Sequence, residues 1–582
     1  MGTGLHPTRP AWSASRVPTT RLTSLLLSVA LVTGLAGCAD DASRRAHPHA
    51  SPSPSRTSDP AKRAAAVAAK LSPEDLVGQV LMPFVYGTDA TKVAGAAKSA
   101  NQQRYGVSTP AELVKRYRLG GLILVRQSDD QTGATNPTSN IDSPAQVRRL
   151  TGGLQHAAGA LNPAKRAGEP VPLLVATDQE HGAVTRLRDG MTLLPTAMGL
   201  GAAHDPNLTE QAWGMAGSEL AAVGVNVDFA PDADVIGSAG NLVIGSRSFG
   251  SDPTAVSEQV AAAVRGLQGS GVAATLKHFP GHGHTTTDSH TGLPVLGYSR
   301  GQLERGDLPP FAAGIDAGTG LVMSGHLDVR SVDPGVPATF SHKVLVDLLR
   351  DKLGFKGVVV TDSMGMEPAR KWSPGEAAVR AILAGNDVLL MPPDLAAARA
   401  GLLRAMESGR LSRQRMVQSV TRILTLKLTL ASHRQPALST VDSGAHHTVA
   451  ADVAAAAVTV LRGTCGRPLV HGPVRVTGGI PEQRDWLAAA LRRQGISVGG
   501  GGSQIHLTGY GDGAGALDPG ADVTVGMDVP YLLGQARSPV VVAAYGANRW
   551  SMAAVAAVLA GKAEAPGRLP VPVKGLPATA CG

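Results

Sequence analysis

The sequence is poor in aromatic residues and cysteine, and beyond residue 36 it has no apolar run long enough to cross a bilayer. Aromatic residues make up 3% of the 582 residues, and cysteine occurs three times. A membrane-spanning helix needs about 20 consecutive apolar residues. These shortages argue against an integral membrane protein with several spans and against a fold held by many disulfides.

The sequence also has no excess of negative charge, because its formal net charge is +9. Residues 1–70 hold nine Lys and Arg against three Asp and Glu, so +6 belongs to the N-terminal part and +3 to the rest. The body of the chain is nearly balanced and shows no basic stripe with interleaved aromatics, which argues against nucleic-acid binding.

The N-terminus has the pattern of an export signal. Arg9, Arg16 and Arg21 precede the apolar run 22–36, and Leu35-Ala36-Gly37-Cys38 follows. This last stretch resembles a bacterial lipobox, which implies a signal peptide over 1–37, cleavage before Cys38 and diacylation of its sulfur. The alternative is an ordinary secretory signal with an incidental cysteine. The polar, Pro-rich stretch 38–63 is predicted to be a disordered tether, so we expect a secreted protein anchored to the outer face of the cell membrane.

What the chain has in plenty is Gly and Pro, 70 and 40 respectively, within a sequence that is 43% hydrophobic. Its length favours one large domain and a smaller one. Eight short apolar runs alternate with stretches of helical spacing, which predicts repeated strand–helix units around a parallel sheet. The runs are 79–85, 120–125, 172–178, 225–230, 272–278, 320–326, 357–362 and 386–391. We therefore predict an α/β protein whose catalytic domain, 64–432, is a (β/α)8 TIM-like barrel.

A smaller α/β/α sandwich domain is predicted over 448–582, after a polar linker at 433–447. Its expected strands are 456–461, 473–476, 504–507, 522–525 and 539–544, with helices at 484–493 and 551–560. Cys465 and Cys581 lie near its two ends, and an extracytoplasmic setting permits a disulfide between them. Such a bond would close a loop worth up to about 4–5 kcal/mol in the chain-entropy model; the alternative is two free thiols.

Polar residues end several of the barrel strands: Asp178, Lys277-His278, His326 and Asp362. In an eight-stranded α/β barrel the active site lies at the carboxyl ends of the strands. Such placement is expected of an enzyme and is unusual for a purely structural protein.

The strongest local signal is the stretch 277–290, which reads Lys-His-Phe-Pro-Gly-His-Gly-His-Thr-Thr-Thr-Asp-Ser-His. Asp288 and His290 are two residues apart, so the carboxylate can bond the imidazole and favour its protonated form. Cleavage of a glycoside requires a proton donor and, in retaining enzymes, an attacking carboxylate. Asp362, held rigidly after an apolar strand, suits the second role. Each element alone has a structural alternative, a helix cap for Asp362 and a simple hydrogen bond for the pair.

Together these segments resemble family 3 glycoside hydrolases, and within them the β-N-acetylhexosaminidases that release N-acetylglucosamine from peptidoglycan fragments. The resemblance covers about residues 71–428. It rests on Thr177-Asp178-Gln179-Glu180, the stretch 225–231, Arg247-Ser248-Phe249-Gly250, the 277–290 loop, Pro337-Ala338-Thr339-Phe340-Ser341, and Leu353-Gly354-Phe355-Lys356-Gly357 leading to Thr361-Asp362.

The resemblance implies that Asp362 is the nucleophile and that His290 is the acid/base, oriented by Asp288. It further implies that the terminal sugar is bound by Asp178, Arg186, Arg247, Lys277 and His278. For Arg186 and Arg247 the structural alternative is a surface or interface ion pair. No metal or other cofactor is implied, and a monomer is expected.

Within this family, the Asp-x-His pair favours the branch acting on N-acetylglucosaminides, because relatives that hydrolyse glucosides lack it. The chain departs from the family pattern after Glu180, where His181-Gly182-Ala183 replaces the usual two glycines and arginine. This puts leaving-group preference in doubt more than the reaction type. The segment Gly567-Arg568-Leu569-Pro570-Val571 resembles the closing strand of the second domain, to which we assign a packing role.

Three other functions are alternatives for this sequence. A metallohydrolase is suggested by the crowding of histidine and aspartate at 278, 282, 284, 288 and 290, although the spacing differs from the familiar metal motif. A non-catalytic lipoprotein that binds glycans or peptides would be expected to have lost part of the Asp288, His290 and Asp362 set. A phosphorylase would keep the same site and use phosphate as acceptor.

Overall fold

The computed structural model describes residues 59–125, 140–161 and 171–581, which fall in one compact unit of the chain. The predicted signal peptide, Cys38 and most of the predicted tether lie outside the described residues. In these ranges, none of the helices combines the length and the apolar character needed to cross a bilayer.

Helix α1 (Pro60–Ala68) begins inside the stretch predicted as tether. Asp59 accepts a hydrogen bond from the backbone N–H of Ala61, and Pro60 occupies the first helical turn, so an Asp-Pro pair starts the helix. Val67 and Ala68 are buried, and α1 packs against α14 (Arg413–Leu430). The folded body therefore starts a few residues earlier than composition predicted.

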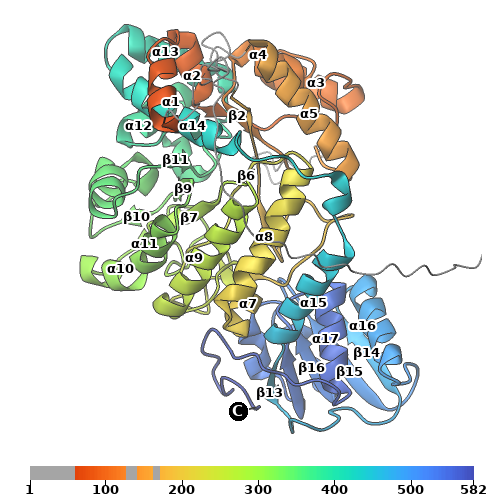
Figure 1. Ribbon diagram of the computed structural model, residues 1–582. Helices are drawn as coiled ribbons and strands as arrows, with labels where there is room; N and C mark the ends of the chain where they lie inside the picture. The colour runs from red at the N-terminus through yellow and green to blue at the C-terminus, as the bar shows by residue number, and fades with distance from the viewer. Residues whose placement is uncertain (1–58, 126–139, 162–170, 582) are drawn as a thin grey trace, which may run out of the picture. The chain divides into compact units, whose positions relative to one another are not determined.

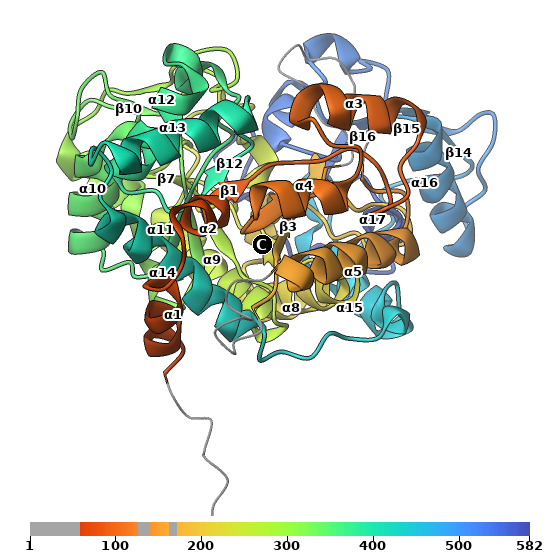
Figure 2. The ribbon, with the colours of Figure 1, turned by 90° about the horizontal axis from the view of Figure 1, so that it is seen from above.

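The eight predicted barrel strands are all present, each within or close to its predicted range (Figures 1 and 2). They are β1 (Leu81–Met82), β2 (Gly121–Ile123), β3 (Leu174–Thr177), β6 (Val227–Asp228), β7 (Thr275–Phe279), β9 (Leu321–Ser324), β11 (Val358–Thr361) and β12 (Leu389–Leu390). Shorter strands lie in the connections: β4 (Gln179–His181), β5 (Val184–Thr185), β8 (Val295–Leu296) and β10 (Asp328–Val329).

Parallel pairing joins seven of the eight pairs of neighbouring barrel strands. Three strands pair in the order β2-β3-β6, three in the order β11-β9-β7, and β1 pairs with β12. Single parallel bridges join β6 to β7 (Val227 to Ala273) and β11 to β12 (Val360 to Val388). The ring closes between β2 and β1, where Ile123 N–H donates to the Pro83 carbonyl at 3.1 Å. The predicted closed barrel is confirmed.

Helices follow the strands and surround them, as the view from above shows (Figure 2). They are α2 (Pro73–Gln79), α3 (Gly95–Tyr105), α4 (Pro110–Tyr117), α5 (Pro144–Leu161), α7 (Ala197–Ala203), α8 (Pro206–Ala222), α9 (Pro253–Gly269), α10 (Arg300–Gly306), α11 (Leu308–Asp316), η3 (Lys343–Lys352), α12 (Pro374–Ala384) and α13 (Leu395–Glu407). Short turns of helix occur at η1 (Gly245–Arg247), η2 (Ala338–Phe340), η4 (Glu367–Lys371) and η5 (Leu438–Thr440).

Many prolines stand at helix starts and not in turns between strands. Asp205-Pro206 begins α8 and Asp252-Pro253 begins α9, and each aspartate accepts two backbone N–H bonds from its helix. Proline suits this position because its missing N–H would be unpaired there anyway. Part of the high proline content therefore fixes where the outer helices begin.

The C-terminal part contains a mixed five-stranded sheet in the order β13-β17-β16-β15-β14, in which β13 alone is antiparallel to its neighbour. Its strands are β13 (Thr459–Arg462), β14 (Val474–Gly478), β15 (Ser503–Thr508), β16 (Val523–Gly526) and β17 (Val540–Ala543). Its helices are α15 (Gly444–Ala457), α16 (Pro481–Arg493), α17 (Arg549–Leu559), η6 (Ala514–Ala516) and η7 (Pro530–Gln535). The predicted second α/β domain is confirmed, and α15 begins within the stretch predicted as linker.

The two faces of this sheet are covered differently. One face shares a core with α16 and α17, including Val542, Leu487 and Val555. The opposite face shares a core with barrel residues Met198 and Ala202 of α7. The barrel thus supplies part of the second covering layer of the sheet.

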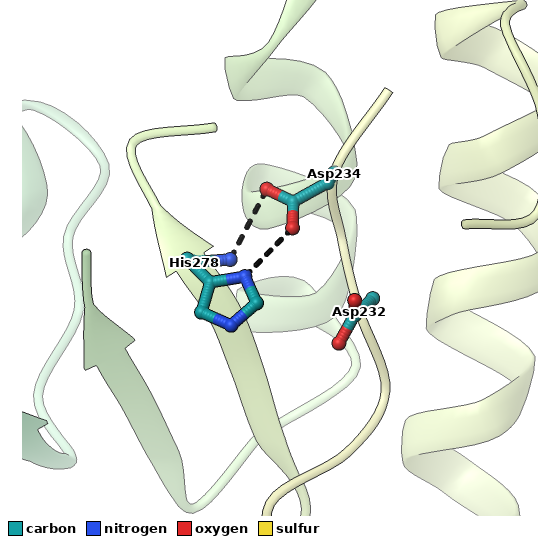
Figure 3. A group of neighbouring side chains, drawn as sticks. All are labelled: Asp232, Asp234 and His278. Carbon is teal, nitrogen blue, oxygen red and sulfur yellow. Dashed lines mark hydrogen bonds and ion pairs between the residues drawn. The ribbon is translucent and has the colours of Figure 1, made fainter. Parts of the chain in front are cut away.

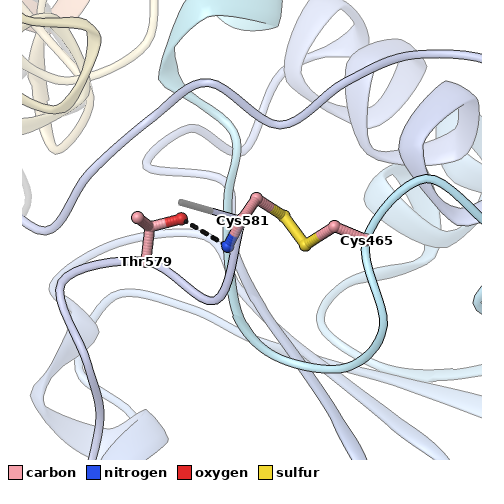
Figure 4. Close-up of a disulfide and its surroundings, with 3 residues drawn as sticks. All are labelled: Cys465, Thr579 and Cys581. Carbon is pink, nitrogen blue, oxygen red and sulfur yellow. Dashed lines mark hydrogen bonds between the residues drawn. A yellow bond between two sulfur atoms is a disulfide. The ribbon is translucent and has the colours of Figure 1, made fainter.

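A disulfide joins Cys465 to Cys581 across a sequence separation of 116 residues, with the Cα atoms 5.5 Å apart (Figure 4). Both cysteines pack against the core that α16 and α17 form with the sheet. The bond ties the segment after β13 to the C-terminal end of the chain.

Lys427 of α14 is buried in the barrel without an acidic partner among the described residues. Its Nζ donates to the side-chain oxygen of Gln79 at 2.8 Å, at the end of α2. Burial lowers the pKa of Lys427 from 10.5 to about 7. The folded state therefore binds a proton at this site less readily than the unfolded chain does.

We expect Lys427→Met to stabilise the protein, and to do so most below about pH 7, where the lysine is protonated in both the folded and the unfolded state. The folded pKa lies below the unfolded value, so the cost of Lys427 shrinks as the pH rises from about 7 towards 10.5. Denaturant unfolding across this range should show the gap between variant and wild type narrowing. Lys98→Met, on the exposed surface of α3, is the matched control; a pH-independent gap would contradict the assignment.

Candidate active site

A cavity of ≈ 540 Å³ opens at the carboxyl ends of the barrel strands. Seven of the residues predicted to act on the sugar line it: Asp178 after β3, Arg186 after β5, Arg247 at the end of η1, Lys277 and His278 of β7, His290 in the loop after β7, and Asp362 after β11. The barrel topology brings these side chains together from distant parts of the sequence.

Lys277 is the centre of a buried ion cluster at the base of this cavity. Its Nζ lies 3.2 Å from Asp178 Oδ1 and 3.9 Å from Asp232 Oδ1, and it forms an ion pair with Glu180. Only 2% of the Lys277 side chain is exposed. Although burial favours the neutral amine, these carboxylates raise the pKa of Lys277, so it stays a cation.

Arg247 is the second cation of the cluster. Its Nε and Nη2 donate to the two carboxylate oxygens of Glu180 at 2.6 and 3.0 Å, a bidentate pair. Burial opposes ionisation of Glu180, yet Arg247 and Lys277 lower its pKa to about 2. Glu180 therefore carries the charge that holds both cations in place.

Asp232 competes for the same two cations. Its Oδ2 lies 3.2 Å from Arg247 Nε, and its side chain is fully buried. Burial and the charge of Glu180 raise the pKa of Asp232, against the attraction of Arg247. Two cations face three carboxylates here, so the least well bonded carboxylate is the one that tends to hold a proton.

His278 is fixed by Asp234, which follows β6 (Figure 3). Asp234 Oδ2 lies 2.8 Å from His278 Nδ1, and Oδ1 accepts the backbone N–H of His278 at 3.1 Å. Burial lowers the pKa of His278 well below its usual range, so the ring is neutral with its proton on Nδ1. This tautomer leaves Nε2 as an acceptor, 3.4 Å from Arg247 Nη2.

Asp232, Asp234 and His278 are close enough to be considered as metal ligands, with candidate atoms within 4.8 Å of one another. However, His278 Nδ1 is already bonded to Asp234, and Arg247 and Lys277 lie beside Asp232. A divalent cation here would be repelled by both cations. The chemistry of the group therefore favours an ion and hydrogen-bond network.

The other residues of the predicted metal motif point to separate partners. His282 Nδ1 lies 2.7 Å from Thr285 Oγ1, and its Nε2 lies 3.3 Å from Ser289 Oγ. His284 Nδ1 lies 2.9 Å from Asp307 Oδ1. Within the described ranges, His282 and His284 therefore do not join one metal-binding site.

Asp362 lies directly after β11, with its backbone N–H bonded to the Ser324 carbonyl of β9 at 3.0 Å. Its Oδ1 accepts the N–H of Ser363 at 2.6 Å. Burial alone would raise the pKa of Asp362, but polar contacts that include the hydrogen bond from the Ser363 N–H hold it below its usual range. The carboxylate is therefore ionised at neutral pH and fixed by the sheet.

His290, in contrast to Asp362, lies on an exposed loop. Its Nδ1 lies 2.7 Å from Asp288 Oδ1, and the same oxygen accepts the backbone N–H of His290 at 2.9 Å. The side chains are 67% and 40% exposed. His290 and Asp362 line the same cavity, and Asp288 orients the imidazole from outside its lining.

Sequence reasoning missed several groups of the site: Glu180, Asp232 and Asp234 were assigned no role, and His326 was noted only as a strand end. Asp232 and Asp234 follow strand β6 within Pro231-Asp232-Ala233-Asp234. The rule that singled out Asp178 and Asp362, a carboxylate just after a barrel strand, would have found them. Glu180 is two residues beyond Asp178, on the short strand β4.

Comparison with known proteins gives a consistent family. Residues 77–426 match the model of the glycosyl hydrolase family 3 N-terminal domain. The chain is 33% identical over 442 residues to Beta-hexosaminidase A of Pseudoalteromonas piscicida, covering 70% of each chain. It is 40% identical over 273 residues to a Beta-hexosaminidase of Xylella fastidiosa (strain M23), covering 46% of this chain and 77% of that one.

Among solved structures, a glycoside hydrolase family 3 beta-N-acetylglucosaminidase from Paenibacillus sp. str. FPU-7 matches with a TM-score of 0.74 and 31% identity, covering 88% of this chain and 100% of that chain. The match extends over the barrel and the C-terminal sheet. Together with the barrel-mouth cavity, these likenesses show that the chain belongs to glycosyl hydrolase family 3 and is a glycoside hydrolase related to the β-hexosaminidases.

Proposed function

We propose that this protein is a retaining exo-β-N-acetylglucosaminidase that hydrolyses terminal N-acetylglucosamine from peptidoglycan-derived glycans. The observation that carries the proposal is that His290 and Asp362 line one cavity, above a buried ion cluster. The names of the relatives support the same sugar.

Asp362 acts as the nucleophile. Its ionised carboxylate attacks the anomeric carbon and forms a glycosyl-enzyme intermediate while the bond to the leaving oxygen breaks. His290 gives its proton to that oxygen, and then, as the neutral base, takes a proton from the water that releases the sugar. Asp288 stabilises the imidazolium at the start of each cycle.

The ion cluster binds the glycone. Lys277 and Arg247 present charged donors, and Asp178 presents an acceptor, all at fixed positions because Glu180 and Asp232 hold the cations. Hydrogen bonds between charged groups and sugar hydroxyls are stronger than neutral ones. His278 and Arg186 complete the cradle from the lining of the cavity.

Phosphorolysis is the alternative outcome at the same site, since phosphate could replace water as acceptor. A chromogenic N-acetylglucosaminide incubated in phosphate buffer would release free sugar in the one case and sugar 1-phosphate in the other. We expect free N-acetylglucosamine. Purified muropeptides then serve to establish the natural aglycone.

We further propose that the protein is exported and held at the outer face of the cell membrane through lipidated Cys38. The support is the arginine-flanked apolar run and the Leu35-Ala36-Gly37-Cys38 stretch. A surface location would place the cavity where cell-wall fragments are released. A monomer without nucleic-acid partners remains the expected state.

We predict that Asp362→Ala lowers kcat by at least about 10³-fold, because it removes the group that forms the covalent intermediate. Substrate binding should persist, since the cradle remains, and calorimetric titration would measure it. Asp351→Ala, an exposed carboxylate at the end of η3, is the control. Retention of a tenth or more of the wild-type kcat would exclude Asp362 as nucleophile.

His290→Ala should lower kcat about 100-fold or more on substrates with poor leaving groups, because general acid catalysis is lost there. Activated aryl glycosides need little protonation and should be affected far less. Asp288→Ala should act in the same direction more weakly, because the imidazole remains. His156→Ala, exposed on α5, is the control; an equal loss on both substrates would argue against the proton-donor role.

Glu180→Gln should raise KM about tenfold or more, a loss of about 1.4 kcal/mol of binding, because Lys277 and Arg247 lose the carboxylate that holds them. Steady-state kinetics on an aryl N-acetylglucosaminide would measure this. Glu258→Gln, on the exposed face of α9, is the matched control. An unchanged KM in a folded variant would show that the cluster does not position the glycone-binding cations.

A further inference from the structure

The two halves of the loop after β7, residues 280–292, differ in how deeply they are buried. Its first half is largely buried, and Gly281, His282, Gly283 and Thr285 are all buried residues. Its second half carries Asp288 and His290, whose side chains are 40% and 67% exposed. The position of the exposed half therefore depends on how the first half is anchored.

His284 anchors the loop to residues that follow it in the chain. Its Nδ1 lies 2.9 Å from Oδ1 of Asp307, a residue whose side chain is 1% exposed. Tyr298 donates its hydroxyl to the other oxygen, Oδ2, of the same carboxylate. The rings of His284 and Tyr298 also meet edge to face, with centroids 5.5 Å apart.

The side chain of Asp307 makes this contact and does not cap a helix. It occupies the N-cap position of α11, where an aspartate side chain usually accepts a backbone N–H of the helix. No such cap bond is formed by Asp307. Both carboxylate oxygens are instead taken by His284 and Tyr298.

Two glycines leave the space that this arrangement needs. A Cβ at Gly237 would lie 1.9 Å from Cδ2 of His284, so any side chain there would displace the ring. Gly281 has φ of +130°, and a Cβ there would lie 2.6 Å from Cβ of Asp307. Side chains at either position would push apart the two partners of the anchor.

From this geometry we propose that His284 is a positioning residue for catalysis: through Asp307 and Tyr298 it anchors the 280–292 loop so that the Asp288–His290 pair stands over the cavity, most firmly when His284 is protonated. The inference rests on the proposed acid/base role of His290. His284 itself does not line the cavity.

The charge of His284 follows from the groups that face it. The hydrogen bond to Asp307 raises the pKa of His284, against the effect of burial, and Asp234 adds to the rise. Tyr298 remains a neutral donor, because burial and Asp307 raise its pKa. With the folded pKa above the unfolded one, the anchor is fully formed at low pH and weakens as pH rises through that value.

The test compares His284→Ala and His284→Asn on two N-acetylglucosaminides, one with a poor alkyl leaving group and one with an activated aryl group. His284→Ala should lower kcat on the poor substrate about tenfold, the size expected for one hydrogen bond involving a charged group, with KM within about twofold. The aryl substrate should change little. His156→Ala is the control, and thermal unfolding shows that each variant is folded.

His284→Asn keeps a donor near the Nδ1 position but cannot be charged. It should recover most of the lost kcat, and its kcat relative to wild type should increase as the pH rises, because only the wild-type anchor weakens. Tyr298→Phe should resemble His284→Ala in a milder form. A pH-independent ratio between His284→Asn and wild type would overturn the role of the charge.

A double-mutant cycle separates this proposal from the one on which it rests. If His284 acts through His290, His284→Ala should have no further effect in a His290→Ala background. An undiminished tenfold loss there, or an equal loss on both substrates, would overturn the positioning role. The acid/base assignment is tested separately by the single variant His290→Ala, in which the contacts of His284 with Asp307 and Tyr298 remain.

Discussion

The ion cluster around Lys277 is the constraint on which the rest of the site depends. Two buried cations, Lys277 and Arg247, are balanced by three carboxylates, which follow β3, lie on β4 and follow β6. Each of these charges would be costly to bury alone, and only the closed barrel brings them within bonding distance. The same arrangement that satisfies the charges leaves a row of oriented donors and acceptors facing a sugar-sized cavity.

The sequence predicted the barrel well because its strands are short apolar runs ending in polar side chains, a pattern set by burial on both faces. It also predicted a site that contains Asp362 and the Asp288–His290 pair, because these residue types at this spacing suit acid/base chemistry, and Asp362 and His290 do line one cavity. Glu180 and Asp234 were missed because their role depends on which residues they contact in the folded protein. A buried carboxylate is recognised by the cations and imidazoles it touches, and sequence spacing does not show those contacts.

Boundaries were the weaker part of the prediction, and local chemistry explains why. Composition placed the end of the tether at residue 63, whereas the Asp59-Pro60 pair starts a helix that α14 then buries. His284 was read only as a possible metal ligand. Its partner Asp307 is 23 residues away and would be assigned from sequence to a helix cap, so the pairing emerges only in three dimensions.

The contact between the second domain and η1 gives that domain an influence on the position of Arg247. Ser246, next to Arg247, donates its hydroxyl to Asp528 of the C-terminal sheet domain, and Ile244 lies in the core shared by both parts. The wall of the barrel-mouth cavity is therefore set partly by a residue 282 positions downstream of Ser246. A change in the second domain can therefore alter the position of Arg247 without changing any of the described residues that line the cavity.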